Sequence, residues 1–136
     1  MKNKFLIIII VITSFLLSCK FVIKNKSDIE QNRQIHFDLI QSVADEYIWN
    51  YDYASIHLLL ERQILWNDCI TIYVTDNMGN LISGYFKDSI NQIKRLRSID
   101  DISNNNNKYL ILEKKFERMF EGKNEYYGNI YAIYKR

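Results

Sequence analysis

The sequence contains no proline and little glycine, cysteine or histidine: four Gly, two Cys and two His among 136 residues. It also lacks an excess of either charge, since 18 Lys and Arg accompany 16 Asp and Glu. Lys2 and Lys4 precede an apolar segment, and without them residues 19–136 carry 16 charges of each sign. A balanced chain gives no electrostatic reason for a nucleic-acid partner, and we expect none.

The scarcity of cysteine and histidine limits disulfide and metal chemistry. Cys19 ends the apolar segment, whereas Cys69 lies in a predicted strand beyond a long predicted helix. We therefore expect no disulfide between them and interpret Cys69 as a small buried hydrophobe. His36 and His57 fall on different predicted helices, with no second Cys or Glu at ligand spacing, so we predict no metal site.

Catalytic signatures are also missing from the sequence. It has no GxSxG, HExxH or CxxC motif and no Gly-rich phosphate loop. The adjacent carboxylates Asp45 and Glu46 fall where we expect a solvated surface. Asp76, Asn77 and Gly79 resemble part of a calcium loop, but the distal Glu is missing and a β-turn explains them better. We therefore predict neither enzymatic activity nor a cofactor.

One long apolar run is present at the start of the chain. Phe5–Ser18 reads FLIIIIVITSFLLS and follows two lysines, which is the order of an n-region and an h-region in an export signal. The run ends Leu16, Leu17, Ser18, Cys19, which resembles the lipobox of bacterial lipoprotein signal peptides. That resemblance implies that Cys19 is lipidated and becomes the mature N-terminus.

An uncleaved transmembrane helix is the alternative. Phe5–Cys19 spans only about 22 Å as a helix, but extension to Ile23 gives about 28 Å, against a hydrocarbon core of about 30 Å. The lysines before the run give the same orientation in both cases, with the N-terminus inside and the remainder outside. We therefore divide the chain into an anchor at residues 1–23 and an extracytoplasmic domain at residues 24–136, on the periplasmic or extracellular side of a bacterial membrane.

Two helices are predicted to follow the anchor. Residues 24–50 lack Pro and Gly, and their first half is mostly charged, which is typical of a solvated stalk. Residues 53–66 form a second helix, which Asp52 is placed to cap. The apolar positions are Ile29, Phe37, Ile40, Val43, Ala44 and Tyr47 in the first helix, of which only those in its second half, from Phe37 onward, are expected to pack on the domain, and Ile56, Leu59, Leu60 and Ile64 on the buried side of the second.

Strands are predicted in the remainder of the chain. Cys69–Thr75 and Leu81–Phe86 flank a short turn containing Asn and Gly, which indicates a hairpin. Tyr109–Arg118 and Tyr126–Lys135 alternate apolar and polar residues around a turn at Glu121–Glu125, which indicates a closing antiparallel pair. Two helices on one face of a four- or five-stranded antiparallel sheet make an α+β fold.

The connector between the two strand pairs, residues 87–108, is less regular. Its apolar residues Ile90, Ile93, Leu96 and Ile99 are predicted to line one short helix. Ser103–Asn107 is predicted to form a polar loop.

The order of these elements resembles the extracytoplasmic sensor domains of bacterial signalling receptors, the PAS-like or single Cache group. The resemblance lies in Ile48–Asp52 between the helices, in IYVTDNMGNLISG at Ile72–Gly84 and in Gly128–Tyr134 of the last strand. It covers residues 25–136 and implies a sensor with a pocket near the connector. Such receptors re-enter the membrane after the last strand, whereas this sequence stops at Arg136. We therefore expect either the sensor half of a receptor or a domain that stands alone on its anchor.

Aromatic residues provide three of the four ligand-binding candidates. Tyr73 and Tyr85 are expected to project from the hairpin toward the connector, where the resemblance places the pocket. Trp49, with Tyr51 and Tyr53, forms a candidate pocket floor. The alternative for all of them is packing in the core, which is the commoner role of large aromatics.

The fourth candidate is Arg97, which forms a basic cluster with Lys94 and Arg95. Such a cluster suits an anionic ligand or phosphate headgroups. The alternative is a solvated face, because Asp100 and Asp101 neutralise the cluster.

These features predict a non-enzymatic, membrane-tethered sensor or ligand-binding module in a bacterial signalling system. Its expected partners are the membrane, a small molecule, and a signalling protein or a second copy of the chain. The alternative is a surface lipoprotein with a structural or host-interaction role and no small-molecule pocket. Lipidation at Cys19 would favour a stand-alone binding protein over receptor input, because a lipid cannot carry a conformational signal across the bilayer.

Overall fold

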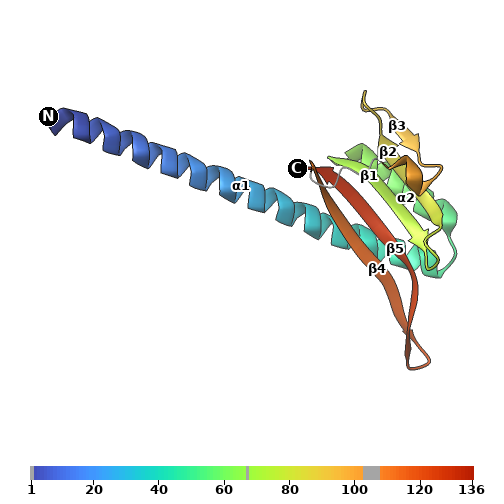
Figure 1. The fold of residues 1–136 in the computed structure, drawn as a ribbon. Coiled ribbons are helices and arrows are strands. Elements are labelled where there is room, and N and C mark those ends of the chain that lie inside the picture. Colours follow the sequence, from blue (N-terminus) through green and yellow to red (C-terminus); the bar gives the residue numbers. More distant parts are fainter. Residues whose placement is uncertain (1, 67, 103–107) are drawn as a thin grey trace. The chain divides into compact units, whose positions relative to one another are not determined.

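The computed structural model describes the backbone of residues 2–66, 68–102 and 108–136, and side chains within these ranges from residue 26 onward except at positions 66 and 101. The chain divides into two compact units, Met1–His36 and Phe37–Arg136. The elements shown in Figure 1 are helices α1 (Lys2–Trp49) and α2 (Tyr53–Trp66), strands β1 (Cys69–Asp76), β2 (Leu81–Lys87), β3 (Ile93–Arg95), β4 (Tyr109–Phe120) and β5 (Lys123–Lys135), and a short 3₁₀ helix, η1 (Ile99–Asp101).

The first unit contains the N-terminal part of α1. Most described side chains at residues 26–36 are exposed, as expected for a solvated stalk. Ile29 lies in this part of α1, and its side chain is 51% exposed. Within the described part of the chain, no helix has the length and apolar character needed to cross a membrane. The predicted anchor and the lipidation of Cys19 lie outside the described side chains.

In the second unit, the end of α1 and all of α2 supply a stripe of side chains to the core. Residues four apart on a helix lie on nearly the same side, so Ile48 continues the stripe of Ala44. Val43 lies well around the helix from this stripe and is 41% exposed, so its predicted burial is wrong. The buried helix side chains are Phe37, Ile40, Ala44 and Ile48 from α1 and Ile56, Leu60 and Ile64 from α2, with Leu59 partly buried.

The sheet has five antiparallel strands in the order β3-β2-β1-β5-β4. Two helices packed on a five-stranded antiparallel sheet confirm the predicted α+β fold. β1 and β2 form the predicted hairpin, and β1 is paired on both sides. Cys69 at the start of β1 is 2% exposed, which confirms its assignment as a buried hydrophobe.

The closing hairpin is longer than predicted. β4 extends to Phe120 and β5 begins at Lys123, so only Glu121 and Gly122 form the turn. Their φ angles are 49° and 78°, and two positive φ angles allow a tight two-residue turn whose twist matches the strands. The predicted turn at Glu121–Glu125 is therefore too long, because the Glu-Gly pair completes the reversal by itself.

The connector contains no helix over Ile90–Ile99, and that prediction is wrong. Ile93–Arg95 instead adds strand β3 to the edge of β2, and the Leu96 N–H then donates to the Gly84 carbonyl at 2.8 Å. A short apolar run satisfies more backbone groups on an open sheet edge than in one isolated helical turn. The predicted loop at Ser103–Asn107 lies outside the described residues.

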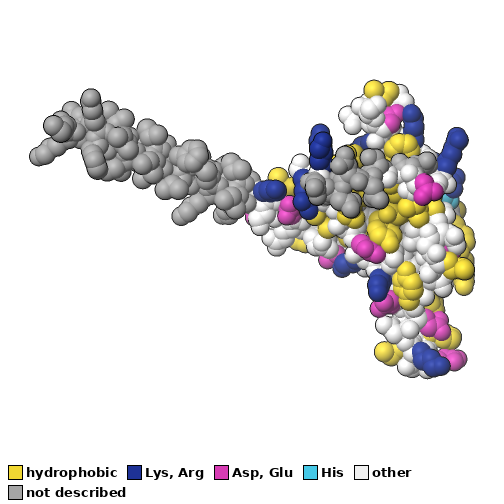
Figure 2. Space-filling model, viewed as in Figure 1, with side chains coloured by type: hydrophobic (Ala, Val, Ile, Leu, Met, Phe, Trp, Pro, Cys, Tyr) yellow, Lys and Arg dark blue, Asp and Glu magenta, His cyan; other side chains and the backbone are white. Residues whose placement is uncertain are grey.

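The face of the sheet opposite the helices carries a second, smaller apolar cluster. It is built around Tyr73, Leu96 and Ile133. Gly84 makes room for it, because a Cβ there would lie 2.6 Å from the Tyr73 Cβ and 2.8 Å from the Leu96 Cδ1. Figure 2 shows basic and acidic side chains interspersed over the visible described surface, in agreement with the balanced charge of the sequence.

Candidate ligand site at the helix elbow

The structure does not bring the four predicted ligand-binding residues together. Tyr73 lies on the open face of the sheet, stacked on Tyr131 with ring centroids 4.6 Å apart, and burial raises its pKa to about 12. Tyr85 lies on the opposite face and packs against the helix-side core; burial raises its pKa as well. Arg97 is exposed after β3, and Trp49 ends α1. Ligand binding by these residues remains a prediction.

The connection between α1 and α2 gives Trp49 its surroundings, and we call residues 49–53 the elbow. The Asp52 N–H donates to the Tyr47 carbonyl at 2.8 Å and the Tyr51 N–H to the Ile48 carbonyl at 3.0 Å. These two bonds form a Schellman arrangement, which needs a left-handed residue directly after the helix. That residue is Tyr51, with φ 55°.

Asp52 completes the elbow as the predicted cap of α2. Its Oδ1 accepts a hydrogen bond from the Ser55 N–H at 3.1 Å. Hydrogen bonds from the Ser55 side chain and backbone lower the pKa of Asp52, so the capping carboxylate stays ionised at neutral pH. The predicted cap is therefore confirmed.

A hollow of about 490 Å³ opens at the elbow. It lies where the elbow, the β1–β2 turn and the β4–β5 hairpin meet, and we call it the elbow hollow. Its lining consists of two aliphatic side chains, four aromatic ones, two carboxylates and one amide: Ile48, Ile82, Trp49, Tyr51, Tyr53, Tyr127, Asp76, Glu125 and Asn77. The predicted grouping of Trp49, Tyr51 and Tyr53 is thus part of its wall.

Sequence reasoning missed the other half of this lining. Tyr127 and Glu125 come from the last hairpin, and the predicted turn at Glu121–Glu125 places Glu125 in the turn instead of in β5. Asp76 was interpreted only as a turn residue, and the turn is confirmed because Asp76 Oδ1 accepts from the backbone N–H groups of Met78 and Asn80 at 2.9 and 2.8 Å. The available signal is that Asp76 directly follows the predicted strand Cys69–Thr75, at the end of a strand, where side chains often line a surface site.

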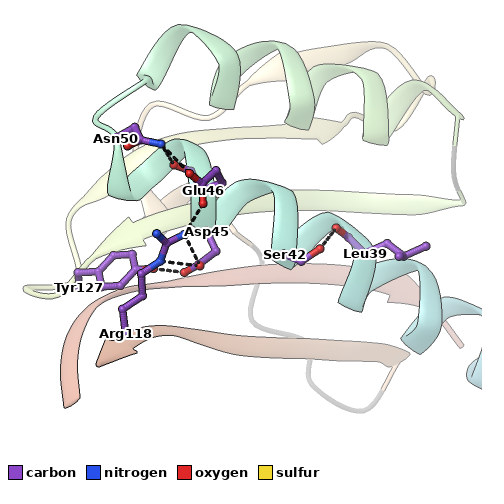
Figure 3. Close-up of polar contacts among 7 residues, drawn as sticks. All are labelled: Leu39, Ser42, Asp45, Glu46, Asn50, Arg118 and Tyr127. Atoms are coloured by element: carbon purple, nitrogen blue, oxygen red, sulfur yellow. Dashed lines mark hydrogen bonds and ion pairs between the residues drawn. The ribbon is translucent and has the colours of Figure 1, made fainter. Parts of the chain in front are cut away.

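A polar cluster joins the hairpin to α1, and we call it the hairpin clamp (Figure 3). Arg118 Nη2 lies 2.9 Å from Asp45 Oδ2 and 2.7 Å from Glu46 Oε2. The Tyr127 hydroxyl donates to the other oxygen of Asp45, and Asn50 Nδ2 donates to Glu46 Oε1 at 2.9 Å. The prediction of a solvated carboxylate pair is wrong for Asp45, because its side chain is only 19% exposed.

The clamp also positions aromatic rings beside the elbow hollow. The guanidinium carbon of Arg118 lies 5.1 Å from the Trp49 ring centroid, within cation–π range. Trp49 meets Tyr127 edge-on at 5.4 Å, and Tyr127 stacks on Phe116 at 5.8 Å. Trp49 and Tyr127 are therefore held in place by neighbours, whereas Tyr51 is 77% and Tyr53 44% exposed.

The elbow hollow is electrostatically negative. Hydrogen bonds, above all from the Asn80 side chain, lower the pKa of Asp76, so this carboxylate is ionised at neutral pH. Glu125 adds a second, exposed carboxylate. Among the described residues that line the hollow, none is Lys or Arg. Such a site disfavours anions and favours cations.

A second, more open hollow of about 730 Å³ lies at the predicted basic cluster, lined by Phe86, Lys94, Arg95 and Arg97. Two of its cations are already engaged, because Lys94 Nζ lies 2.7 Å from Asp88 Oδ2 and Arg95 Nη2 lies 3.0 Å from His57 Nε2. The counter-ion of Lys94 is thus Asp88. The side chain of Asp101, one of the predicted neutralising residues, lies outside the described ones.

His57 bridges α2 to β2 and β3 in its neutral form. A guanidinium only donates hydrogen bonds, so Nε2 of His57 accepts from Arg95 and the proton lies on Nδ1, 2.5 Å from Ser83 Oγ. Burial and the charge of Arg95 lower the pKa of His57. Since Nδ1 donates to Ser83, it does not act as the base that a nucleophilic serine requires.

The buried thiol is not a nucleophile either. Burial raises the pKa of Cys69 to about 12, so the thiol stays protonated at neutral pH. In the described part of the chain, no three His, Cys, Asp or Glu side chains gather as metal ligands would. Of the two hollows described above, we therefore take the elbow hollow, with its larger set of lining residues, as the candidate site.

Comparison of the chain with models of known families, with curated proteins and with solved structures found no match. The class that the structure itself defines is an α+β domain, with two helices packed on a five-stranded antiparallel sheet.

Proposed function

We propose that this chain is a non-enzymatic, extracytoplasmic sensor or ligand-binding module, held at a bacterial membrane by its N-terminal segment. The observation that carries the proposal is the elbow hollow, which combines aromatic walls, two carboxylates and an amide in about 490 Å³. Pockets that bind small molecules combine apolar walls with a few polar groups in this way. The assignment of the chain to the PAS-like or single Cache group is part of the same proposal. It is supported by the resemblance of local sequences and by the α+β fold.

The position of the hollow suits a sensor. Its lining joins the end of α1 to two strand hairpins, and Glu46 connects the elbow residue Asn50 to Arg118 of β4. A ligand that contacts both sides changes the energy of the contacts between α1 and the hairpin. A signalling protein or a second copy of the chain would receive that change.

A thermal-shift screen tests this function. A ligand at 100 times its Kd stabilises the folded state by about 2.7 kcal/mol, which raises the melting temperature by several degrees. We expect at least one compound in a panel of amino acids, carboxylates, amines and sugars to do so with the full chain in maltoside micelles. A flat response across the panel would favour the alternative, a surface lipoprotein without a small-molecule pocket.

Two turn variants locate the binding. Asn77→Trp introduces a bulky side chain into the lining of the hollow, whereas Met78→Trp introduces the same side chain at the next position, which is 83% exposed and outside the lining. We expect Asn77→Trp to abolish the shift and Met78→Trp to keep it. Equal responses of the two variants would place the ligand elsewhere and refute the assignment of the site.

Labelling with palmitate tests the mode of attachment. We expect the wild-type chain to incorporate the label and the Cys19→Ser variant to lose it. A chain that stays in the membrane without label in both forms would instead be held by an uncleaved helix. In that case the receptor version of the proposal gains support, because a helix transmits conformational change and a lipid does not.

A further inference from the structure

We infer that the elbow hollow selects a small organic cation, one that carries an ammonium group on a short carbon chain. This inference rests on the proposed function and specifies its ligand class. It depends on the chemistry of the lining: aromatic rings attract cations through their quadrupoles, carboxylates attract them through charge, and the apolar side chains accommodate carbon.

The charges near the hollow support this choice. Asp76 and Glu125 line it, and the hairpin clamp adds Asp45, which accepts a hydrogen bond from the lining residue Tyr127, and the adjacent Glu46. Arg118 is the cation within the clamp. These four carboxylates and the one guanidinium together carry a net charge of −3. An anionic ligand would be repelled, and a neutral one would gain nothing from this field.

The Trp49 ring already packs against a cation of the chain itself. Its ring accepts the Arg118 guanidinium at 5.1 Å, while Arg118 is also bound to Asp45 and Glu46. A ring that lies next to two carboxylates is the arrangement that an ammonium ligand requires. Tyr51, Tyr53 and Asp76 bring the same residue types, aromatic rings and a carboxylate, to the lining of the hollow.

Tyr51 presents an exposed aromatic ring in the lining of the hollow. It occupies the left-handed position of the Schellman arrangement, where glycine is the ordinary residue, and its side chain is 77% exposed. A bulky residue in this conformation is strained, and little burial offsets the strain. Its described ring neighbour is Tyr53, edge-on at 6.4 Å, so the two rings form an exposed pair at the mouth of the hollow.

A matched pair of probes tests the charge requirement. Choline carries a quaternary ammonium, and 3,3-dimethyl-1-butanol has the same shape without the charge. We expect choline to shift the indole N–H signal of Trp49 saturably in ¹H–¹⁵N NMR spectra of the full chain in maltoside micelles. The neutral isostere should bind at least about 10-fold more weakly. The Trp49 signal is identified as the one that Trp66→Phe retains.

Substitutions test the residues. Tyr51→Gly keeps the backbone conformation and removes the ring, and we expect it to weaken choline binding about 5-fold. Glu125→Gln should weaken it about 3-fold. The matched controls are Tyr126→Ala, an exposed aromatic on the same hairpin but outside the lining, and Glu61→Gln, an exposed carboxylate on α2; both should bind choline as the wild type does.

The outcomes separate this inference from the proposed function. Equal binding of the charged and neutral probes, or wild-type affinity in Tyr51→Gly and Glu125→Gln, overturns the choice of a cation. If an anionic or neutral panel compound binds and Asn77→Trp blocks it while choline does not bind, the ligand-binding function is supported and the cation is rejected. If no panel compound and neither probe binds, both are overturned.

Discussion

The centre of the sheet and its rim are stabilised in different ways. The centre consists of β1 and residues 128–134 of β5, where Ile72, Val74, Ile130 and Ala132 are each at most 1% exposed. The rim consists of the elbow, the hairpin tip at residues 117–127, and β3. It is held by the hairpin clamp and by the contacts of His57. Both hollows lie at the rim, so apolar burial fixes the backbone while polar contacts shape the surface that is available to ligands.

Gly128→Ala tests how closely the centre is packed and should give the largest effect. The φ of Gly128 is 158°, and a Cβ there would overlap the Thr75 carbonyl oxygen of the paired strand. Backbone cannot move aside as a flexible side chain can, so we expect a loss of about 3 kcal/mol in the free energy of unfolding. Guanidinium titration of the full chain measures it.

Gly79→Ala is the matched control for that variant. Gly79 has φ 85° in the β1–β2 turn, but a Cβ there meets no described atom within 4 Å. Only the left-handed conformation opposes alanine, at a cost of about 1 kcal/mol. Equal losses of stability in the two variants would show that the close approach of Thr75 to Gly128 adds no cost. The centre would then be no more tightly packed than the turn at this position.

Arg118→Ala tests the rim and should have the next largest effect. It removes the guanidinium between Asp45 and Glu46 and leaves the 19%-exposed Asp45 with only the Tyr127 hydroxyl. We expect a loss of about 1–2 kcal/mol, measured by the same titration. The mobility of the hairpin tip should also increase, which would appear as faster amide exchange at residues 121–126.

Lys114→Ala is the control for the clamp. Lys114 pairs with Asp38 of α1 at 2.8 Å, but both side chains are more than one third exposed. An exposed pair contributes about 0.5 kcal/mol or less. A larger loss for Lys114→Ala than for Arg118→Ala would show that the charge of β4, rather than the clamp, holds the hairpin to α1.

His57→Asn tests the rim through pH. The pKa of His57 is lowered in the folded state, so below about pH 6.5 the unfolded chain takes up a proton that the folded chain resists. Stability therefore falls as the pH drops, by at most about 1.4 kcal/mol per pH unit. Asn keeps a donor for Ser83 and does not titrate. The free energy of unfolding of His57→Asn should therefore change less between pH 7.5 and 5.5 than that of the wild type.

The difference between wild type and His57→Asn reports the contribution of His57 to the pH dependence of stability. Asp52, Asp76 and Asp88 have lowered pKa values, so they stay ionised over this range and their contributions are lost only at more acidic pH. Equal pH dependence of the free energy of unfolding in wild type and His57→Asn would show that the bridge to Arg95 does not keep the ring neutral.

The two regions also differ in how far the sequence predicts them. The β-branched run of β1 and the Asn-Gly turn after it predict the first hairpin, because these are local signals. The 3.6-residue period similarly predicts α2 and its cap at Asp52. The error over Val43 arises because its spacing from Ile40 fits the helical period, although Val43 lies well around the helix from the side that the sheet covers.

The rim depends on contacts between residues far apart in the chain, which local patterns do not contain. Arg118 and Asp45 are 73 residues apart, and neither position has an unusual sequence context. β3 forms because β2 offers an open edge, not because Ile93–Arg95 is a strong strand by itself. The lining of the elbow hollow is predicted only in part for the same reason. Its aromatic residues at 49–53 are close in sequence, whereas Tyr127 and Glu125 come close to them only when the β4–β5 hairpin packs beside the elbow.

Tyr51→Gly should give a small effect on stability, with the opposite sign to the variants above. Glycine adopts φ 55° without strain, so this change should raise the free energy of unfolding by about 0.5–1 kcal/mol while it removes a ring from the elbow hollow. Tyr51→Asn is the control, since Asn tolerates the same conformation and should recover part of the gain. A gain in stability together with a loss of choline binding would show that the rim retains a strained tyrosine at the expense of stability, as binding sites do. A loss of stability would instead show that the Tyr51 side chain stabilises the elbow by packing. The elbow would then resemble the centre of the sheet, and the proposed difference between centre and rim would not hold there.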